Sequence, residues 1–308
     1  MTNPNNPEAL RFLEDWLQPA IEEADTIASR GGISLGIPTG FNELDELTNG
    51  LQMGTLTVVG AHPGVGASTL VLDIARSCAV KHGMETLFLT LETQPMSVVK
   101  RLLSAEAKIR IADLHSGRMS DDDWTKLARR MSEISEAPLI VDRPTDRDIS
   151  AIVELITEVA ERSETDAART GLRLVVIDSL QLLTARTDLP YENREREVSE
   201  VVRRLKALAH DLEIAVVVTS QLSSNPGPRQ LPRLPALADL RDSGTIAHVA
   251  DTVVLLHRPD AWERDDPRGG EADVIVAKHR QGPTATITVA HQMHLSRFVD
   301  MARGAAAG

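Results

Sequence analysis

The residues best suited to chemistry lie in a glycine-rich segment that runs from Gly60 to Thr69 (GAHPGVGAST). An apolar stretch at 55–60 leads into it and a helical pattern follows, so the segment joins a predicted strand to a predicted helix. Such a turn predicts a phosphate-binding loop, because free backbone N–H groups and a helix N-terminus attract phosphate oxygens; an ordinary turn without a ligand is the alternative. We expect the phosphates of ATP to bind to Ala61, His62, Pro63, Gly64, Val65, Gly66, Ala67, Ser68 and Thr69, and Mg²⁺ to bind to the Ser68 hydroxyl.

Position 67 departs from the phosphate-loop pattern, which has a lysine before the serine or threonine. That lysine contacts the β- and γ-phosphates and stabilises charge as the phosphoryl group is transferred. An alanine does neither, so we expect poor turnover of a nucleotide that the backbone still binds. His62 and Lys81 are the nearest residues able to carry positive charge, and we expect neither to replace the lysine. The sequence leaves open whether Ala67 is natural or engineered.

Three further polar residues end or follow predicted strands. Glu92 follows TLFLTL, Asp178 ends LRLVVID and Gln221 follows IAVVVTS. Ligands of parallel sheets bind at the carboxyl ends of the strands, so we expect these side chains beside the phosphate loop. Glu92 is then the candidate that orients or activates the attacking water, Asp178 holds the Mg²⁺ shell, and Gln221 senses the γ-phosphate. Each is an ordinary polar strand end by itself, but three beside one phosphate loop favour a catalytic site.

Lys278 and Arg280 close a predicted strand near the C-terminus. They either pair with surface carboxylates or act on the nucleotide of an adjacent subunit, as an arginine finger does to accelerate phosphoryl transfer.

The segment 222–250 is long, rich in proline and placed between two predicted strands. Its arginines (Arg229, Arg233 and Arg241) outnumber Asp239 and Asp242. Long loops are usually functional or disordered, so these arginines either follow a single-stranded DNA backbone inside a pore or belong to a mobile loop.

The rest of the chain predicts one α/β domain. Apolar runs rich in β-branched residues predict strands at 55–60, 86–91, 137–141, 172–178 and 214–220. Helical patterns separate them, at 68–82, 94–106, 121–135, 148–162 and 194–212. This alternation predicts a mainly parallel sheet covered on both faces. Four closely spaced runs after residue 250 predict antiparallel additions at the sheet edge: 252–257, 273–278, 285–290 and 296–301.

The N-terminal region has a different pattern. Apolar residues recur every three or four positions over 8–29, which predicts an amphipathic helix that Pro19 divides in two. Its apolar stripe must pack on this domain or on a neighbouring subunit. We therefore expect a disordered tail and an amphipathic linker helix over 1–30, followed by a single domain over 31–308.

Composition narrows the class of protein. The 308 residues are 42% hydrophobic and 25% charged, which is ordinary for a globular chain. A net charge of -12 means that any contact with nucleic acid is local, because proteins that coat DNA are usually basic, and 3% aromatic residues argue against a base-stacking platform. One cysteine, no signal peptide and no membrane-spanning run predict a cytoplasmic protein without a membrane partner.

Six segments together resemble the C-terminal motor domain of the DnaB family of hexameric replicative helicases. They appear in the family's order from about residue 15 to 302: IASRGGISLGIPTGFNELDELTNGLQMG, LFLTLETQPMSVVKRLLSAEA, LVVIDSLQLL, VVVTSQLS, LADLRDSGTIAHVADTVVLLHR and EADVIVAKHRQGPTATITVA. The resemblance implies a RecA-like subunit of a homo-oligomeric ring, a hexamer in the family, with ATP between neighbours and single-stranded DNA in the pore.

The resemblance also assigns roles to residues. It implies Glu92 as the catalytic carboxylate, Asp178 as the Mg²⁺-shell residue and Gln221 as the sensor. Lys278 and Arg280 look like the family's finger pair, which acts on the neighbouring subunit. The loop that contacts DNA in the family is similar to the segment that holds Arg241, Asp242 and Gly244.

Several features depart from the family. The N-terminal domain that forms a collar and takes part in primase contacts is not found, and Ala67 replaces the lysine. Asp242 stands where the family usually has glutamate, and Ala247, His248 and Val249 stand where it usually has more polar residues.

Two functions remain open. One is an ATP-dependent DNA helicase or translocase subunit. The other is an impaired paralogue that binds nucleotide and regulates or scaffolds a full-length helicase or another replication protein. The helicase-type segments argue against a third class, the RecA-fold signalling or recombination ATPases.

Overall fold

The structure is a computed structural model that describes residues 12–29, 36–166, 169–186, 191, 193–222, 233–240, 243–263 and 265–301. The chain divides into two compact units, residues 1–35 and 36–308, which are described separately.

The first unit contains one helix, α1 (Leu13–Ser29), with Pro19 inside it. The prediction that Pro19 divides this stretch is wrong: proline removes a single backbone N–H, and the hydrogen bonds on either side keep the helix continuous. The Phe12 N–H donates to the Asp15 carboxylate at 2.8 Å, which stabilises the first turn. Large apolar side chains of this unit are exposed, so the packing partner of the stripe stays a prediction: Phe12, Leu13, Trp16, Leu17 and Ile21.

The second unit is built on a nine-stranded sheet within the described residues, in the order β3-β2-β4-β5-β1-β6-β7-β8-β9. The strands are β1 (Leu56–Ala61), β2 (Glu85–Thr90), β3 (Leu139–Asp142), β4 (Leu172–Asp178), β5 (Ala215–Gln221), β6 (Thr252–His257), β7 (Glu271–His279), β8 (Thr286–Gln292) and β9 (Arg297–Asp300). Pairing is parallel from β3 through β6 and antiparallel from β6 through β9. The predicted α/β class, a mainly parallel sheet with antiparallel edge strands, is confirmed.

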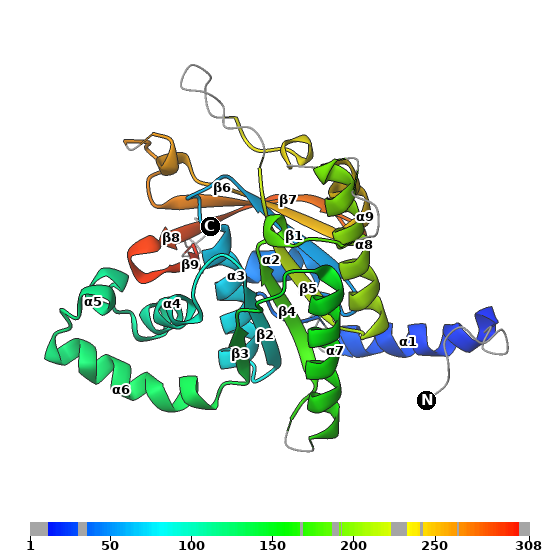
Figure 1. Cartoon of the computed structure of the whole chain (residues 1–308), viewed down its shortest axis with the longest axis horizontal. Helices are drawn as coiled ribbons and strands as arrows, with labels where there is room; N and C mark the ends of the chain where they lie inside the picture. Colours follow the sequence, from blue (N-terminus) through cyan, green and yellow to red (C-terminus); the bar gives the residue numbers. More distant parts are fainter. Residues whose placement is uncertain are drawn as a thin grey trace. The chain divides into compact units, whose positions relative to one another are not determined.

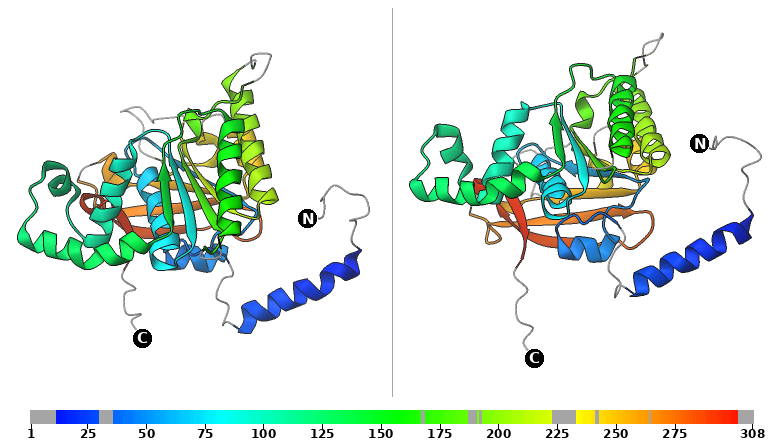
Figure 2. Two further views of the ribbon diagram at one scale, coloured as in Figure 1. Left: turned by 60° about the horizontal axis from the view of Figure 1, so that its bottom comes forward. Right: turned by 90° about the horizontal axis from the view of Figure 1, so that it is seen from below.

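Helices cover both faces of this sheet (Figures 1 and 2). They are α2 (Asn42–Thr48), α3 (Ala67–Arg76) with a π-helical extension (Ser77–Lys81), α4 (Pro95–Ala107), α5 (Ile111–Ser116), α6 (Asp121–Glu136), α7 (Ile149–Thr165), α8 (Arg194–Asp211) and α9 (Ser243–Val249). Short 3₁₀ turns occur at Leu180–Leu182, Leu237–Asp239, Pro259–Ala261 and Met293–Leu295. Helices α7 and α8 pack on one face, and α2 and α3 pack on the other.

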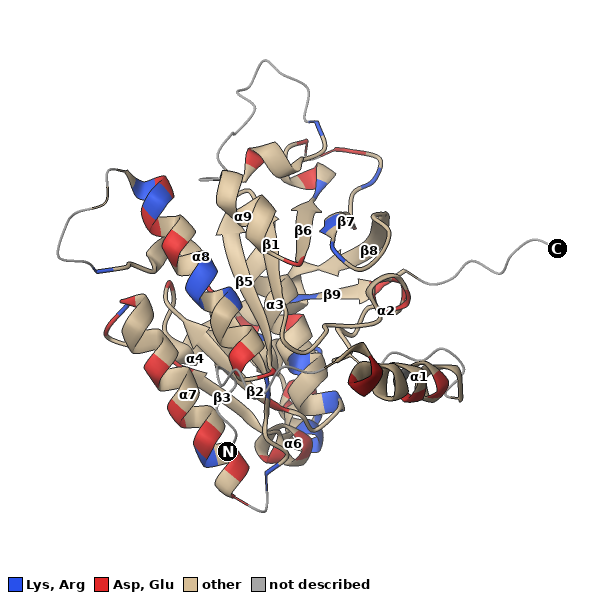
Figure 3. Ribbon diagram, turned by 90° about the vertical axis from the view of Figure 1, so that its right-hand side faces the viewer, with Lys and Arg blue, Asp and Glu red and all other residues tan. Residues whose placement is uncertain are grey.

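Side chains of the central strands point alternately to the two faces of the sheet and pack into a hydrophobic core on each face. In β4, Val175 and Ile177 join the core under α7 and α8, whereas Leu174 and Val176 join the core under α3. Burial on both faces explains why the central strands are continuous apolar runs in the sequence. Figure 3 shows the consequence: the strands are nearly free of charged residues, which gather instead along helices such as α7 and α8.

Three elements differ from the sequence prediction. The strand β6, grouped with the antiparallel additions, pairs in parallel with β1 and antiparallel only with β7. The segment 222–250, predicted as a loop, ends in the helix α9. The short helices α2 and α5 were not predicted, because six or seven residues hold too few turns to establish a helical period.

Candidate nucleotide-binding site

A pocket opens where β1, β2, β4 and β5 end. Every residue of the predicted phosphate loop except Val65 lines it, together with Glu92, Asp178 and Gln221. These residues come from four strand ends that are far apart in the sequence, and the parallel pairing of the strands brings them to one edge. The expectation that they gather in one place agrees with this geometry.

The loop between β1 and α3 has the form of a phosphate cradle. Gly64 and Gly66 have φ angles of 80° and 119°, a region that disfavours other residues. A Cβ on Gly66 would also lie 3.0 Å from the Phe298 ring. Among the described residues, the N–H groups of Gly64, Gly66, Ala67 and Ser68 have no hydrogen-bond acceptor. Free donors at the start of a ten-residue helix fit phosphate oxygens.

Val65 is the loop residue that faces away from the pocket. Its side chain is buried in the core with α3, and its N–H donates to the His62 carbonyl at 3.2 Å. The Val65 carbonyl accepts from Arg258 Nη1 at 3.3 Å. Val65 therefore holds the loop in place through contacts on the side away from the pocket.

Positive charge in the pocket is scarce. With Ala67 in place of lysine, Arg101 of α4 is the one permanently charged cation among the described lining residues, against the carboxylates of Glu92 and Asp178. Burial lowers the pKa of His62, whose ring is also in edge contact with Trp262, so its charged form is disfavoured. Lys81 does not line the pocket: it ends the π-helical extension at the far end of α3.

Arg101 is the site residue that the sequence prediction missed. It lies within α4, which starts just after β2 and brings it over the pocket. Its guanidinium makes no hydrogen bond or ion pair with any described residue, so its donors are free for a ligand. The only sequence signal was an arginine inside a helix that begins at the ligand-binding edge of the sheet.

The three polar residues at the strand ends differ in their burial and in their hydrogen bonds. Asp178 is buried, and its Oδ1 accepts from Thr219 Oγ1 at 2.6 Å, which orients the carboxylate. Glu92 is exposed and makes no hydrogen bond or ion pair with the described residues, so its carboxylate is free to accept a proton. Gln221 pairs with Ala61 across β5 and β1, which brings it beside the start of the loop.

The oxygen ligands that the protein offers in this pocket suit a Mg²⁺ ion whose remaining ligands are phosphate and water. The described residues contain no group of three or more His, Cys, Asp or Glu side chains gathered to bind a metal. The Ser68 hydroxyl and the Asp178 carboxylate are the oxygen donors that line the pocket close to the loop. Mg²⁺ commonly takes one or two protein oxygens and completes its shell with phosphates and water, so the residues present fit it.

Lys278 and Arg280 lie outside this pocket, at the C-terminal end of α9. Lys278 Nζ donates to the carbonyls of His248 and Ala250 at 2.9 and 2.6 Å. Arg280 Nη2 lies 3.4 Å from the His248 and Val249 carbonyls, and its Nε is 3.3 Å from Asp251 Oδ1. Burial, and then repulsion from Arg280, lowers the pKa of Lys278. Neither cation reaches the nucleotide pocket of its own chain.

The predicted DNA-contact residues are only partly within the described chain. Arg241 and Asp242, like Arg229, lie outside the described residues, whereas Gly244 is exposed in the first turn of α9. Arg233 forms an ion pair with Asp239.

The comparison with known families decides the identity. Residues 36–300 match the family described as "DnaB-like helicase C terminal domain". The chain belongs to this family. A replicative DNA helicase DnaB of Leifsonia xyli subsp. xyli (strain CTCB07) is 46% identical over 290 residues, which cover 94% of this chain. The chain spans 61% of the length of that relative.

Solved structures agree with this membership. The ATPase domain of G40P superposes with a TM-score of 0.83 at 27% identity, over 92% of this chain and 98% of that one. A DnaB-like replicative helicase, solved for its interactions with primase, superposes with a TM-score of 0.82 at 28% identity, over 95% of this chain and 68% of that one. The predicted DnaB-like, RecA-like ATPase domain is confirmed. No described helix is both long and apolar enough to span a membrane.

Proposed function

We propose that this DnaB-family chain is an ATP-dependent motor subunit that moves on single-stranded DNA within a homo-oligomeric ring, with slow hydrolysis because of Ala67. The observation that carries the proposal is the shared pocket of the phosphate loop, Glu92, Asp178 and Gln221. A copy with a purely structural role would have no reason to keep a free carboxylate and free backbone donors at one strand edge.

Each residue has a distinct task in this proposal. Glu92 takes the proton of the attacking water as the bond between the β- and γ-phosphates breaks. Ser68 and Asp178 hold Mg²⁺, directly or through water, and the ion neutralises charge on the phosphates. Gln221 contacts the γ-phosphate.

Lys278 and Arg280 act on the nucleotide of the adjacent subunit in this proposal. Their position outside their own pocket is compatible with such a role. Both also bind carbonyl groups at the end of α9, which begins next to the proposed DNA contacts Arg241, Asp242 and Gly244. The finger pair therefore contacts the C-terminal end of the helix whose first turn holds Gly244.

The second candidate is a nucleotide-binding paralogue that regulates or scaffolds a full-length helicase or another replication protein. The observation in its favour is the charge of the pocket, where Arg101 faces two carboxylates without the usual lysine. A buried point charge contributes several kcal/mol to transition-state stabilisation in sites of this kind, roughly a hundredfold or more in rate.

The two candidates differ in DNA-stimulated turnover. We expect the purified chain to hydrolyse ATP slowly, to be stimulated by single-stranded DNA, and to lose about 100-fold or more of that rate in Glu92→Gln. The Glu92→Gln variant should still bind nucleotide, as measured by fluorescence of a labelled ATP analogue. Binding without DNA-stimulated turnover in the parent would favour the paralogue. Turnover that survives Glu92→Gln unchanged would contradict the assigned site.

A further inference from the structure

A second pocket lies among the ends of α3 and α4, helix α6 and β9. Among the described residues that line it, Glu106 is the one acidic residue and six are cations: Arg76, Lys108, Lys126, Arg129, Arg130 and Arg297. A chain with a net charge of -12 would not gather six cations around one concavity by composition alone.

The neighbouring carboxylates neutralise only part of this charge. Glu106 is buried and both of its oxygens are occupied, by Arg76 and Arg130. Lys126 pairs with Asp122 and Asp123 on its own helix. Three cations form no direct ion pair with any described carboxylate: Lys108, Arg129 and Arg297.

Arg297 is the most constrained of these three. It is half-buried, and it donates only to neutral acceptors, Gln292 Oε1 at 2.8 Å and the Ala105 carbonyl at 3.5 Å. Burial, and then repulsion from Arg76, lowers the pKa of Arg297, against the opposing attraction to Asp73 and Glu106.

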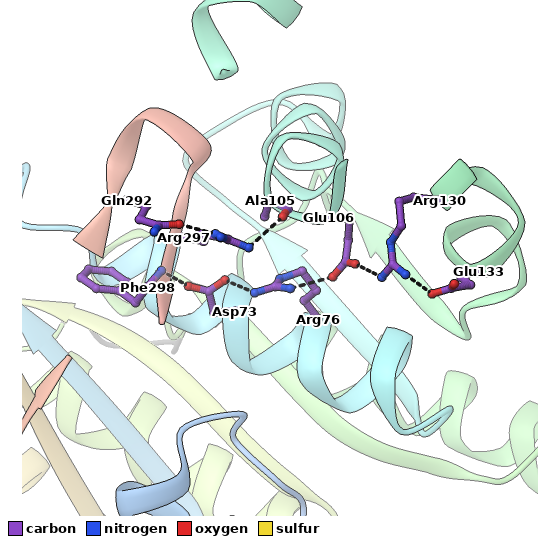
Figure 4. A network of polar contacts seen from close by, with 9 residues as sticks. All are labelled: Asp73, Arg76, Ala105, Glu106, Arg130, Glu133, Gln292, Arg297 and Phe298. Atoms are coloured by element: carbon purple, nitrogen blue, oxygen red, sulfur yellow. Dashed lines mark hydrogen bonds and ion pairs between the residues drawn. The ribbon is translucent and has the colours of Figure 1, made fainter. Parts of the chain in front are cut away.

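The polar network beneath the pocket has more donors than acceptors (Figure 4). The Arg76 side chain is 9% exposed, and it forms ion pairs through Nη1 with Glu106 and through Nη2 with Asp73. The Nε atoms of Arg76 and Arg130 are buried, and neither has a hydrogen-bond partner in the described part of the chain. Buried donors are normally satisfied, so these two Nε atoms are unused donors beside the pocket.

We propose that this pocket binds a compact oligophosphate, a small ligand with two or more linked phosphate groups. Guanidinium groups match phosphate oxygens with paired hydrogen bonds, and Lys108 adds a mobile point charge. No aromatic side chain lines the pocket, so recognition acts on the phosphates and not on a stacked base.

Three elements connect this pocket to the nucleotide site. Helix α3 has Ala67 in one pocket and Arg76 in the other, and α4 has Arg101 in one and Glu106 in the other. In the turn before β9, Met293 and Ser296 line the nucleotide pocket, and the next residue, Arg297, lines the second pocket.

A hydrogen bond ties the same elements together. The Phe298 N–H donates to Asp73 Oδ2 at 2.6 Å, and the Phe298 ring packs against Gly66 of the phosphate loop. A bound oligophosphate that attracts Arg76 and Arg297 would therefore shift α3 and β9, and with them the phosphate loop. In this way the ligand would act as an effector of the nucleotide site. This coupling, unlike the binding itself, rests on the proposed function.

The test is a calorimetric titration of the full chain with inorganic tripolyphosphate, without nucleotide. We expect saturable binding that weakens tenfold or more in the double variant Lys108→Ala/Arg129→Ala. Both side chains are exposed and unpaired, so the fold is not at risk, and an unchanged melting temperature verifies this. Arg101→Ala is the matched control, because it removes a cation from the nucleotide pocket alone.

Three results would overturn the proposal. The first is that the parent does not bind tripolyphosphate. The second is that tripolyphosphate binding is lost in Arg101→Ala but kept in the double variant. The third is that the double variant weakens binding of a single-stranded oligonucleotide but leaves binding of tripolyphosphate unchanged. None of these measurements uses ATP turnover, so a failure here is separate from a failure of the proposed motor activity.

Discussion

At the scale of single residues, the charge lost at Ala67 makes Arg101 the main cation available to a nucleotide in this chain. Arg101 is free of protein partners, and it lines the same pocket as Ser68 and Glu92. A guanidinium placed there supports phosphate binding, because charge-assisted hydrogen bonds are stronger than neutral ones.

Removal of Arg101 should therefore weaken nucleotide binding. For Arg101→Ala we expect an affinity for Mg²⁺-ATP about tenfold lower, equivalent to about 1.4 kcal/mol. Lys100→Ala is the matched control, since Lys100 is the preceding residue of α4 and does not line the pocket. Equal affinities of the two variants in equilibrium binding would show that the arginine has no part in the site.

At the scale of elements, Asp73 joins α3 to β9 through the Phe298 N–H and to Arg76 through an ion pair. Burial raises the pKa of Asp73 to about 6 from 3.8, against the opposing effect of Arg76. The folded chain therefore holds a proton between about pH 4 and pH 6 that the unfolded chain has released.

This protonation gives Asp73 a pH-dependent effect on stability. Its contribution to the free energy of unfolding is fully present below pH 3.8 and falls as pH rises toward about 6. We expect the difference in unfolding free energy between the parent and Asp73→Asn to decline over that range, in denaturant titrations at a series of pH values. A difference that grows with pH would show that attraction to Arg76 outweighs burial.

The elements also show what the sequence can and cannot predict. The buried strands were predicted within a few residues, because short apolar runs rich in β-branched residues, such as Leu172–Asp178, favour a strand buried on both faces. Glu92, Asp178 and Gln221 were predicted because parallel strands bring their carboxyl ends together. Arg101 was missed because its position depends on how α4 packs, which no local pattern encodes. The direction of β6 was missed for the same reason, since pairing is a tertiary property.

At the scale of the whole molecule, the second unit combines a DnaB-family ATPase fold with an alanine, Ala67, where the general phosphate-loop pattern has a lysine. The free N–H donors of the loop, the ordered Asp178 and the free Glu92 make a site that lacks one charge. The central claim is that this site is otherwise competent for ATP hydrolysis.

The most direct test is a steady-state comparison of ATP hydrolysis by the parent and Ala67→Lys, with and without single-stranded DNA. We predict that Ala67→Lys raises kcat roughly 100-fold and that DNA stimulates it further, because the new ammonium group reaches the β- and γ-phosphates. A variant that binds nucleotide but hydrolyses it no faster than the parent would contradict the claim.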